Sequence, residues 1–83
     1  MTKVFSIYDT KAESYLPPFY FKTKAEAIRA LETTVKDPNR ETQIKLYPHD
    51  YNLMELGDFD ELRGKFNLHD SPQLLCNASE FTI

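Results

Sequence analysis

Aromatic and basic side chains are concentrated between positions 11 and 29, and they are the residues of this sequence best suited to binding chemistry. Single-stranded nucleic acid is held by this combination, because aromatic rings stack on bases while Lys and Arg neutralise phosphates. Tyrosine tolerates solvent through its hydroxyl. We therefore predict stacking by Tyr15 and Tyr20, and phosphate contacts by Lys11, Lys22, Lys24 and Arg29.

The phenylalanines of the same stretch are expected to have a different role. Successive side chains of a strand point to opposite faces, so Phe19 and Phe21 share one face and Tyr20 lies on the other. We expect the two phenylalanines in the core. The seven-residue spacing of Lys22, Arg29 and Lys36 places them along one side of a helix, which a solvated face explains as readily as a phosphate track.

Signals for catalysis or metal binding are weak. The only glycines are Gly57 and Gly64, which excludes a glycine-rich phosphate loop. The pairs His49-Asp50 and His69-Asp70 are expected in surface turns, and the acidic run at 58–61 lacks the ligand pattern of a calcium loop and is expected to be a solvated hairpin turn. We expect no enzyme, no metal and no cofactor.

The totals predict one small domain. A chain of 83 residues forms a single domain, residues 1–83, with one core. A single cysteine, Cys76, excludes an internal disulfide. Self-association is the remaining way to add stability, so a homodimer is expected. No long apolar run or leader segment is present, so we expect a soluble, intracellular protein with Cys76 reduced and buried.

The net charge of −3 is unevenly distributed. Residues 1–45 hold eight basic and six acidic side chains, whereas residues 46–83 hold two basic and seven acidic ones, giving +2 and −5. This asymmetry is typical of an anion-binding half, of complementary faces for self-association, or of an ordinary mixed surface.

The elements that must position these residues follow from local patterns. Residues 4–8 and 19–21 are rich in β-branched and aromatic side chains and predict two antiparallel strands. Thr23 and Glu26 form a capping box, which starts a helix over 24–36. Asp37-Pro38 ends that helix, because the residue before a proline is pushed out of the helical region.

The second half of the chain predicts a hairpin. Ile44, Leu46 and Tyr47 indicate the start of a strand that Pro48 interrupts. Residues 51–57 and 65–68 predict two more strands joined by a turn at 60–64, and the apolar tail 73–83 is expected to pack on the sheet or on a partner. The order ββαββ predicts a small α+β domain with about four antiparallel strands and one amphipathic helix.

The chain also resembles the small non-structural protein of gokushoviruses, the single-stranded DNA phages of the Microviridae. Three N-terminal segments carry the resemblance: residues 4–9 (VFSIYD), 18–20 (PFY) and 26–29 (EAIR). Three later ones follow in the same order: residues 49–53 (HDYNL), 56–60 (LGDFD) and 77–81 (NASEF). The resemblance covers nearly the whole chain through this ordered set.

The resemblance implies a DNA-binding or replication-associated protein that helps to switch genome synthesis toward single strands for packaging. It also implies a protein of the infected bacterial cytoplasm that is not part of the virion. The acidic C-terminal half departs from what a strong non-specific DNA binder needs, unless a dimer gathers two basic halves. The alternative function is a protein-interaction module that binds a host or viral replication protein, with the acidic hairpin at 58–61 in its face.

Overall fold

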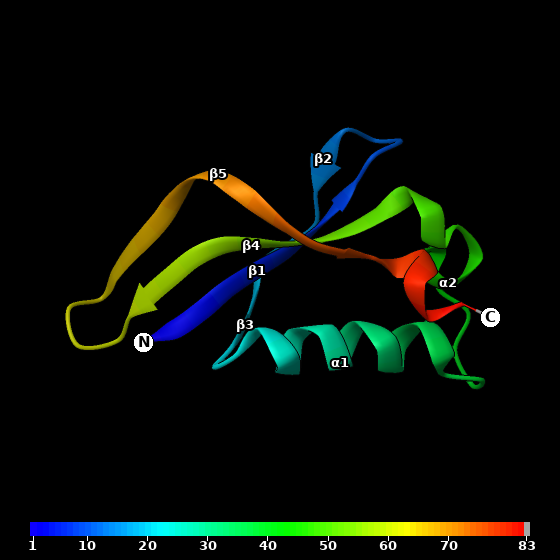
Figure 1. Cartoon of the computed structure of the whole chain (residues 1–83), viewed down its shortest axis with the longest axis horizontal. Coiled ribbons are helices and arrows are strands. Elements are labelled where there is room, and N and C mark those ends of the chain that lie inside the picture. Colours follow the sequence, from blue (N-terminus) through cyan, green and yellow to red (C-terminus); the bar gives the residue numbers. More distant parts are fainter. Residues whose placement is uncertain (83) are drawn as a thin grey trace.

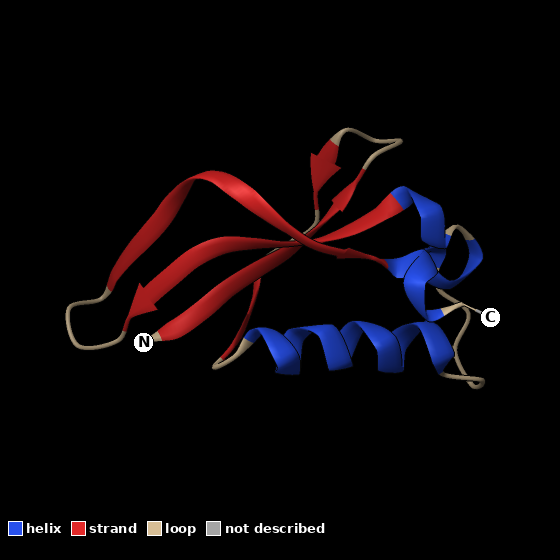
Figure 2. Cartoon of the chain, in the orientation of Figure 1, coloured by secondary structure: helices blue, strands red, loops and turns tan. Residues whose placement is uncertain are grey.

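The computed structural model describes residues 1–82 as an antiparallel sheet with one long helix packed on one of its faces (Figures 1 and 2). The elements, in chain order, are β1 (Thr2–Asp9), β2 (Ser14–Tyr15), β3 (Phe19–Phe21), α1 (Lys24–Lys36), α2 (Gln43–Leu46), the 3-10 helix η1 (Pro48–Asp50), β4 (Tyr51–Asp60), β5 (Lys65–Asn77) and the 3-10 helix η2 (Ala78–Phe81). The predicted α+β class is confirmed.

The sheet has the order β2-β1-β4-β5, and β3 pairs with the edge of β1 that also pairs with β2. All pairings are antiparallel. Because the two short strands share one edge of β1, the sheet is four strands wide. The long hairpin of β4 and β5 extends past the start of α1, so its tip is not covered by the helix (Figure 1).

Helix α1 begins and ends where the sequence predicts. The hydroxyl of Thr23 accepts a hydrogen bond from the backbone N–H of Glu26 at 3.2 Å, and the Glu26 carboxylate accepts one from the N–H of Thr23 at 3.1 Å. This capping box pairs donors that the first helical turn leaves free. At the other end, Lys36 pairs with Glu32 at 2.7 Å, and Asp37 is the C-cap residue.

The core lies between α1 and one face of the sheet. Ala27, Leu31 and Val35 form the buried stripe of the helix, and Phe5 and Leu53 are the largest fully buried side chains of the sheet. The expected positions of the aromatic core residues are confirmed. Both phenylalanines of β3 pack against this core, and the side chain of Cys76 is buried in it.

Two irregularities change which residues face the helix. Val4 pairs with Gly57 while Phe5 pairs with Glu55, so Leu56 is an extra residue in β4. Opposite it, four residues of β5 (69–72) lie between the partners of Gly57 and Glu55. A bulge of this kind shifts the alternation of side chains between the two faces. Asp58 therefore lies on the same face as Phe5, and Phe59 lies on the opposite face.

The structure corrects three sequence predictions. The segment with Ile44 and Leu46 is the short helix α2, because the Thr42 hydroxyl accepts from the N–H of Lys45 at 3.1 Å and caps it. Strand β5 continues to Asn77, so His69 lies in a strand and not in a surface turn. Asp58–Asp60 likewise belong to β4, and Asp60 is buried.

The apolar tail packs on its own chain in the part that the structure describes. Cys76 and Ala78 are buried in the core, and Leu75 and Phe81 pack against it. Leu74 is the exception, because its side chain is 62% exposed. Ile83, the last residue of the predicted tail, lies outside the described residues.

Candidate nucleic-acid interface

The face of the sheet opposite α1 carries the exposed aromatic side chains. Phe5 and Ile7 of β1 point toward the helix, so alternation places Thr2, Val4 and Tyr8 on the other face. Residues that pair across strands share a face. The register therefore adds to this second face Tyr15, Tyr20, Met54, Gly57, Phe59, Phe66, Leu68 and Leu74.

Three aromatic residues surround a hollow on this face, which we call the aromatic hollow. Thr2, Tyr20, Phe59 and Phe66 line it, and its volume is about 200 Å³. The rings of Phe59 and Phe66 pack with their centroids 4.9 Å apart. Tyr20 is 47% exposed and Phe66 is 54% exposed, so both rings keep surface on which a flat ligand can stack.

A second aromatic pair lies farther along β1. The rings of Tyr8 and Tyr15 have centroids 4.7 Å apart, and Tyr15 is 45% exposed. Tyr15 pairs with Tyr8, whereas Tyr20 pairs with Val4. Four residues of a strand span about 13 Å, so the two predicted stacking residues lie on one face at a distance that a few nucleotides can bridge.

One lysine and one glutamate stand at the rim of the aromatic hollow. The Nζ atom of Lys22 lies 3.3 Å from the hydroxyl of Thr2, and Thr2 lines the hollow. The same hydroxyl, with the positive charge of Lys22 nearby, lowers the pKa of Glu61 below its usual range. The rim therefore holds a cation that a phosphate can approach and an anion that opposes it.

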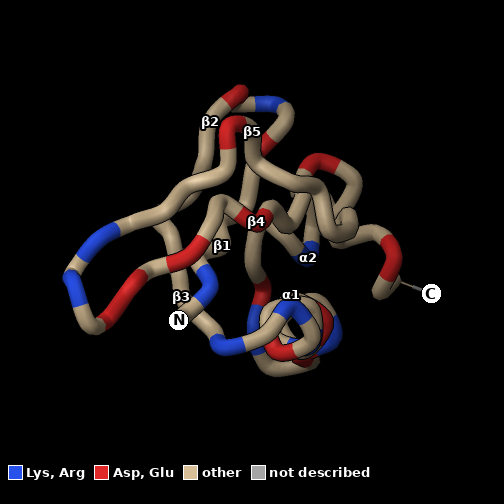
Figure 3. Tube along the Cα trace, turned by 60° about the vertical axis from the view of Figure 1, so that its left-hand side comes forward, with Lys and Arg blue, Asp and Glu red and all other residues tan. Residues whose placement is uncertain are grey.

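The other predicted phosphate contacts are dispersed. Lys11 lies in the turn between β1 and β2, Lys24 is the first residue of α1, and Arg29 is exposed on α1 beside Phe21 and Thr33. Helix α1 covers the face opposite the aromatic hollow, so the structure does not bring Arg29 to Tyr20. Figure 3 shows Lys/Arg and Asp/Glu positions mixed around α1 and along the β4–β5 loop.

The acidic hairpin is largely neutralised by neighbouring cations. Asp58 lies 3.8 Å from the Nζ atom of Lys3, and Asp60 pairs with Arg63 at 3.0 Å. The Arg63 guanidinium and the backbone N–H groups of the turn lower the pKa of Asp60. Glu61 is exposed, and its Oε2 atom lies 3.7 Å from the N-terminal amino group of Met1. The hairpin therefore does not present a block of negative charge.

A buried carboxylate on the helix-facing side escaped the sequence analysis. Glu55 is 3% exposed, and its Oε2 atom lies 2.6 Å from the Nε2 atom of His69. The Nζ atom of Lys3 lies 3.8 Å from the Oε1 atom of Glu55, which has no hydrogen-bond partner among the residues that the structure describes. Among residues 1–82, no group of three or more His, Cys, Asp and Glu side chains is placed to hold a metal ion.

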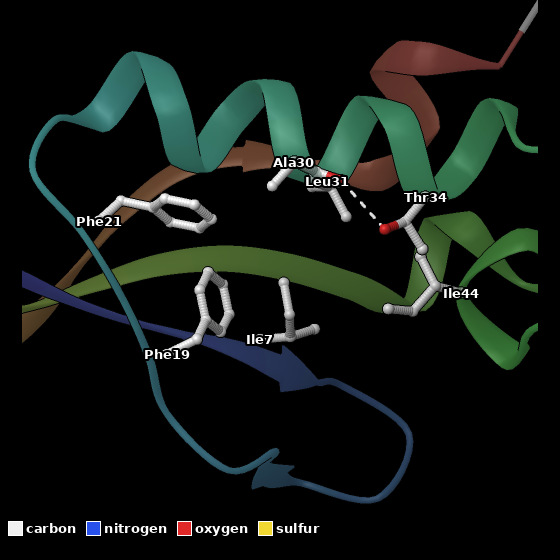
Figure 4. Close-up of a pocket in the computed structure, with 7 residues that line it drawn as sticks. All are labelled: Ile7, Phe19, Phe21, Ala30, Leu31, Thr34 and Ile44. Atoms are coloured by element: carbon white, nitrogen blue, oxygen red, sulfur yellow. Dashed lines mark hydrogen bonds between the residues drawn. The ribbon is translucent and has the colours of Figure 1, made fainter.

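An apolar groove lies between α1 and β3. Its volume is about 310 Å³, and its lining residues are Ile7, Phe19, Phe21, Ala30, Leu31, Thr34 and Ile44. Figure 4 shows the two phenylalanine rings and Ile7 directed toward the helix, with the Thr34 hydroxyl bonded to the Ala30 carbonyl at 3.0 Å. Because none of the described residues that line it is charged, this groove suits an apolar group and not a phosphate.

The described helices do not include one that is both long and apolar enough to cross a membrane.

Comparison with known proteins identifies the family. Residues 2–81 match the model of the family described as Phage ORF5 protein. The chain belongs to the Phage ORF5 protein family. It is 36% identical over 82 residues to Protein ORF5 of Chlamydia phage 1, an alignment that covers 95% of this chain and 85% of that protein. No solved structure matches the fold significantly.

Membership of the ORF5 family confirms the phage origin that the sequence resemblance implies. The match spans every element from β1 to η2. Both the aromatic hollow and the Tyr8–Tyr15 pair therefore lie within the part of the chain that defines the family.

Sequence reasoning missed three residues of the aromatic face: Tyr8, Phe59 and Phe66. The sequence pattern predicts a strand at Tyr8 and no binding role, Phe59 lies in an acidic run that is typical of a turn, and Phe66 is an isolated aromatic residue. The alternation of β1 places Tyr8 on this face. No sequence signal places Phe59 there, because its direction depends on the extra residue Leu56.

Proposed function

We propose that this ORF5 protein is a non-enzymatic, single-stranded DNA-binding protein of a gokushovirus-type phage, acting in the infected bacterial cytoplasm during genome replication or packaging. The observation that carries the proposal is the aromatic hollow, where Tyr20 and Phe66 expose about half of their surface on an uncovered sheet face. Exposed rings on a sheet are a platform on which bases stack, and each stacked base contributes about 1–3 kcal/mol.

The proposed binding mode uses few charges. A base stacks on the rings of the aromatic hollow, and the adjacent phosphate approaches the Nζ atom of Lys22 at its rim. Single-stranded DNA that continues from the aromatic hollow along β1 reaches Tyr15, which packs on Tyr8. Because acids and bases are mixed elsewhere on the surface, stacking supplies most of the affinity and phosphate contacts supply a minor share.

The test is fluorescence anisotropy of a labelled poly-dT oligonucleotide across a salt series. Each phosphate contact to a single strand contributes about −0.7 to the slope of log K against log salt, so we expect a shallow slope. A duplex of equal length is expected to bind more weakly, and an RNA oligonucleotide shows whether the sugar matters. Absence of binding at low salt, from protein shown to be folded, would overturn the proposal.

Two matched pairs of variants locate the site. Tyr20→Ala is expected to weaken binding by about 5- to 100-fold, the loss of one stacked base. Tyr47→Ala is the control, because Tyr47 is 56% exposed at the end of α2. Lys22→Ala is expected to weaken binding and flatten the salt slope, whereas Lys36→Ala, in the last turn of α1, leaves it unchanged.

Arg29→Ala extends the same test to the helix. Arg29 lies on α1 and Tyr20 on the uncovered face, so Arg29 contributes only when the strand passes around the start of the helix. A flatter salt slope in Arg29→Ala supports this longer path. An unchanged slope confines the phosphate contacts to the rim at Lys22.

A second candidate function, a module that binds a viral or host replication protein, is favoured by the groove between α1 and β3. Its lining is apolar, and a pocket of about 310 Å³ accommodates a large side chain of a partner. A dye that fluoresces in apolar surroundings is expected to bind the native protein there. Ala30→Phe fills the groove and is expected to abolish that signal; an unchanged signal argues against an accessible groove.

A further inference from the structure

The outer edge of β5 is a long backbone edge that pairs with no other strand in the described part of the chain. β5 has 13 residues and stands at the end of the sheet, where it pairs with β4 on one side only among residues 1–82. The opposite end of the sheet is formed by β2 and β3, which have two and three residues and are separated by two prolines. Such short, interrupted edges do not accept another strand readily, whereas a long one does.

Within β5, the regular part is the segment 65–68. Lys65, Phe66, Asn67 and Leu68 pair in sequence with Asp60, Phe59, Asp58 and Gly57. The irregular residues 69–72 follow, and Pro72 lacks a backbone N–H. Natural edges are protected by lysine, proline and bulges. In β5 the lysine lies at the start of the regular segment, and the bulge and the proline follow its end. The residues between them are therefore free of these protecting features.

Exposed apolar side chains accompany this edge. Phe66 is 54% exposed and Leu68 is 60% exposed, although both belong to a strand that pairs regularly with β4. The hairpin tip that carries them lies past the start of α1, where the helix covers neither face (Figure 1). An uncovered edge and uncovered apolar side chains on one strand are the two parts of a strand-pairing surface.

We propose that β5 pairs antiparallel with β5 of a second copy of this chain, about a two-fold axis that passes through Asn67. Paired residues of an antiparallel ladder share a face, so a symmetric ladder must be centred on a residue. Centring on Asn67 sets Phe66 against Leu68 of the second copy, apolar against apolar. Centring on Leu68 would instead set Phe66 against the charged Asp70.

The charges of the segment also favour the antiparallel arrangement. Lys65 lies at one end of the regular segment and Asp70 lies two residues beyond its other end, and neither forms an ion pair within residues 1–82. An antiparallel pair brings the basic end of each copy beside the acidic end of the other. A parallel pair would place like charges together.

The pairing would join two sheets into one. A two-fold axis perpendicular to the sheet keeps each face on its own side, so the two aromatic hollows would lie on the same side of the dimer. This inference does not rest on the proposed function, although a joined face would lengthen the platform available to a single strand.

The first experiment measures the molar mass of the full chain without DNA, by light scattering after size exclusion. We expect twice the mass of the chain.

Leu68→Lys is expected to give a monomer that is still folded by circular dichroism, with dimer affinity reduced more than about tenfold, because the lysine would be buried against Phe66 of the second copy. Leu74→Lys is the matched control, since Leu74 is 62% exposed on the same strand but lies beyond Pro72, and it is expected to remain dimeric.

A cysteine cross-link tests the register. Asn67→Cys places two thiols opposite each other at the axis, so mild oxidation is expected to link the dimer covalently, whereas Gln73→Cys is not. Cys76 is buried and stays out of the reaction. A monomeric wild type, a Leu68→Lys variant that dimerises as well as Leu74→Lys, or equal cross-linking at positions 67 and 73 would overturn the proposal.

The two proposals fail separately. A monomer that still binds poly-dT overturns the β5 dimer and leaves the DNA-binding function in place. A wild-type protein that forms a dimer sensitive to Leu68→Lys but binds no oligonucleotide overturns the DNA-binding function and leaves the β5 dimer in place.

Discussion

The Nε2 atom of His69 lies 2.6 Å from the Oε2 atom of Glu55, and this contact joins the irregular part of β5 to β4. Glu55 is almost completely buried, and the Nζ atom of Lys3 stands 3.8 Å from its other carboxylate oxygen. A buried carboxylate is costly unless it has a hydrogen-bond partner. His69 supplies that partner from the irregular part of β5.

We predict that His69→Ala lowers the free energy of unfolding by about 1–3 kcal/mol, because it leaves the buried Glu55 oxygen without a donor. Urea denaturation followed by circular dichroism measures the change. His49→Ala is the matched control: His49 is exposed, and its replacement is expected to change the stability by less than about 0.5 kcal/mol. Equal effects of the two substitutions would contradict a structural role for the His69–Glu55 contact.

The two glycines are predicted to differ sharply in their tolerance of alanine. A Cβ atom at Gly57 would stand 2.3 Å from the Asn67 carbonyl oxygen and 2.6 Å from the Cα atom of Leu68, and its φ is +154°. Gly57→Ala must push β4 and β5 apart and is expected to cost about 3 kcal/mol or more.

Gly64→Ala is the comparison for this prediction. Gly64 has a φ of +66°, but no atom of residues 1–82 lies within 4 Å of a Cβ at this position, so only backbone strain of about 1 kcal/mol is expected. Thermal or urea denaturation of both variants gives the order. A Gly57→Ala variant as stable as Gly64→Ala would show that the two strands are less closely apposed at the bulge.

The fold was predictable where local rules decide it. The capping box of Thr23 and Glu26 sets the start of α1, Asp37-Pro38 sets its end, and runs of aromatic and β-branched residues set β1 and β3. These signals lie within a few residues of one another. The resulting α+β class followed from their order alone.

The irregular parts of β4 and β5 and the residues of the aromatic hollow depend on pairings between residues that are distant in the sequence. The extra residue Leu56 in β4 and the irregular residues 69–72 in β5 follow no periodic pattern, because they are defined by pairings of β4 with β1 and β5 rather than by neighbours in the sequence. His69 therefore looked like part of a turn. For the same reason, the exposure of Tyr20 was predictable from its strand, whereas its neighbours Phe59 and Phe66 in the aromatic hollow were not.

The buried thiol of Cys76 predicts a loss of stability in alkaline solution. Burial, with a smaller contribution from Glu80, raises the pKa of the Cys76 thiol from 9.0 to about 11. Between these values the unfolded chain loses the thiol proton and the folded chain keeps it, so the free energy of unfolding falls as the pH rises from 9 to 11. Burial raises the pKa of Tyr51 as well, which acts in the same direction.

Denaturation at several alkaline pH values measures this decline, and Cys76→Ala is expected to make it shallower. Thiol labelling gives a second readout: at pH values well below 11, the native protein is expected to react slowly and the unfolded chain rapidly. Labelling of the native protein at the rate of the unfolded chain would show that Cys76 is accessible.

Glu61 is predicted to restrain DNA binding. Its carboxylate competes with a phosphate at the rim of the aromatic hollow, because the hydroxyl of Thr2 and the charge of Lys22 stabilise its ionised form and lower its pKa. Glu61→Gln removes this negative charge and is expected to tighten binding of poly-dT by about 2- to 5-fold at low salt, with a smaller gain at high salt. Anisotropy titration measures the change.

Glu32→Gln is the control, because it removes the same charge from α1, where Glu32 pairs with Lys36. Equal gains in the two variants would mean that Glu61 acts only through the net charge of the protein, and that the phosphate lies elsewhere than beside Lys22.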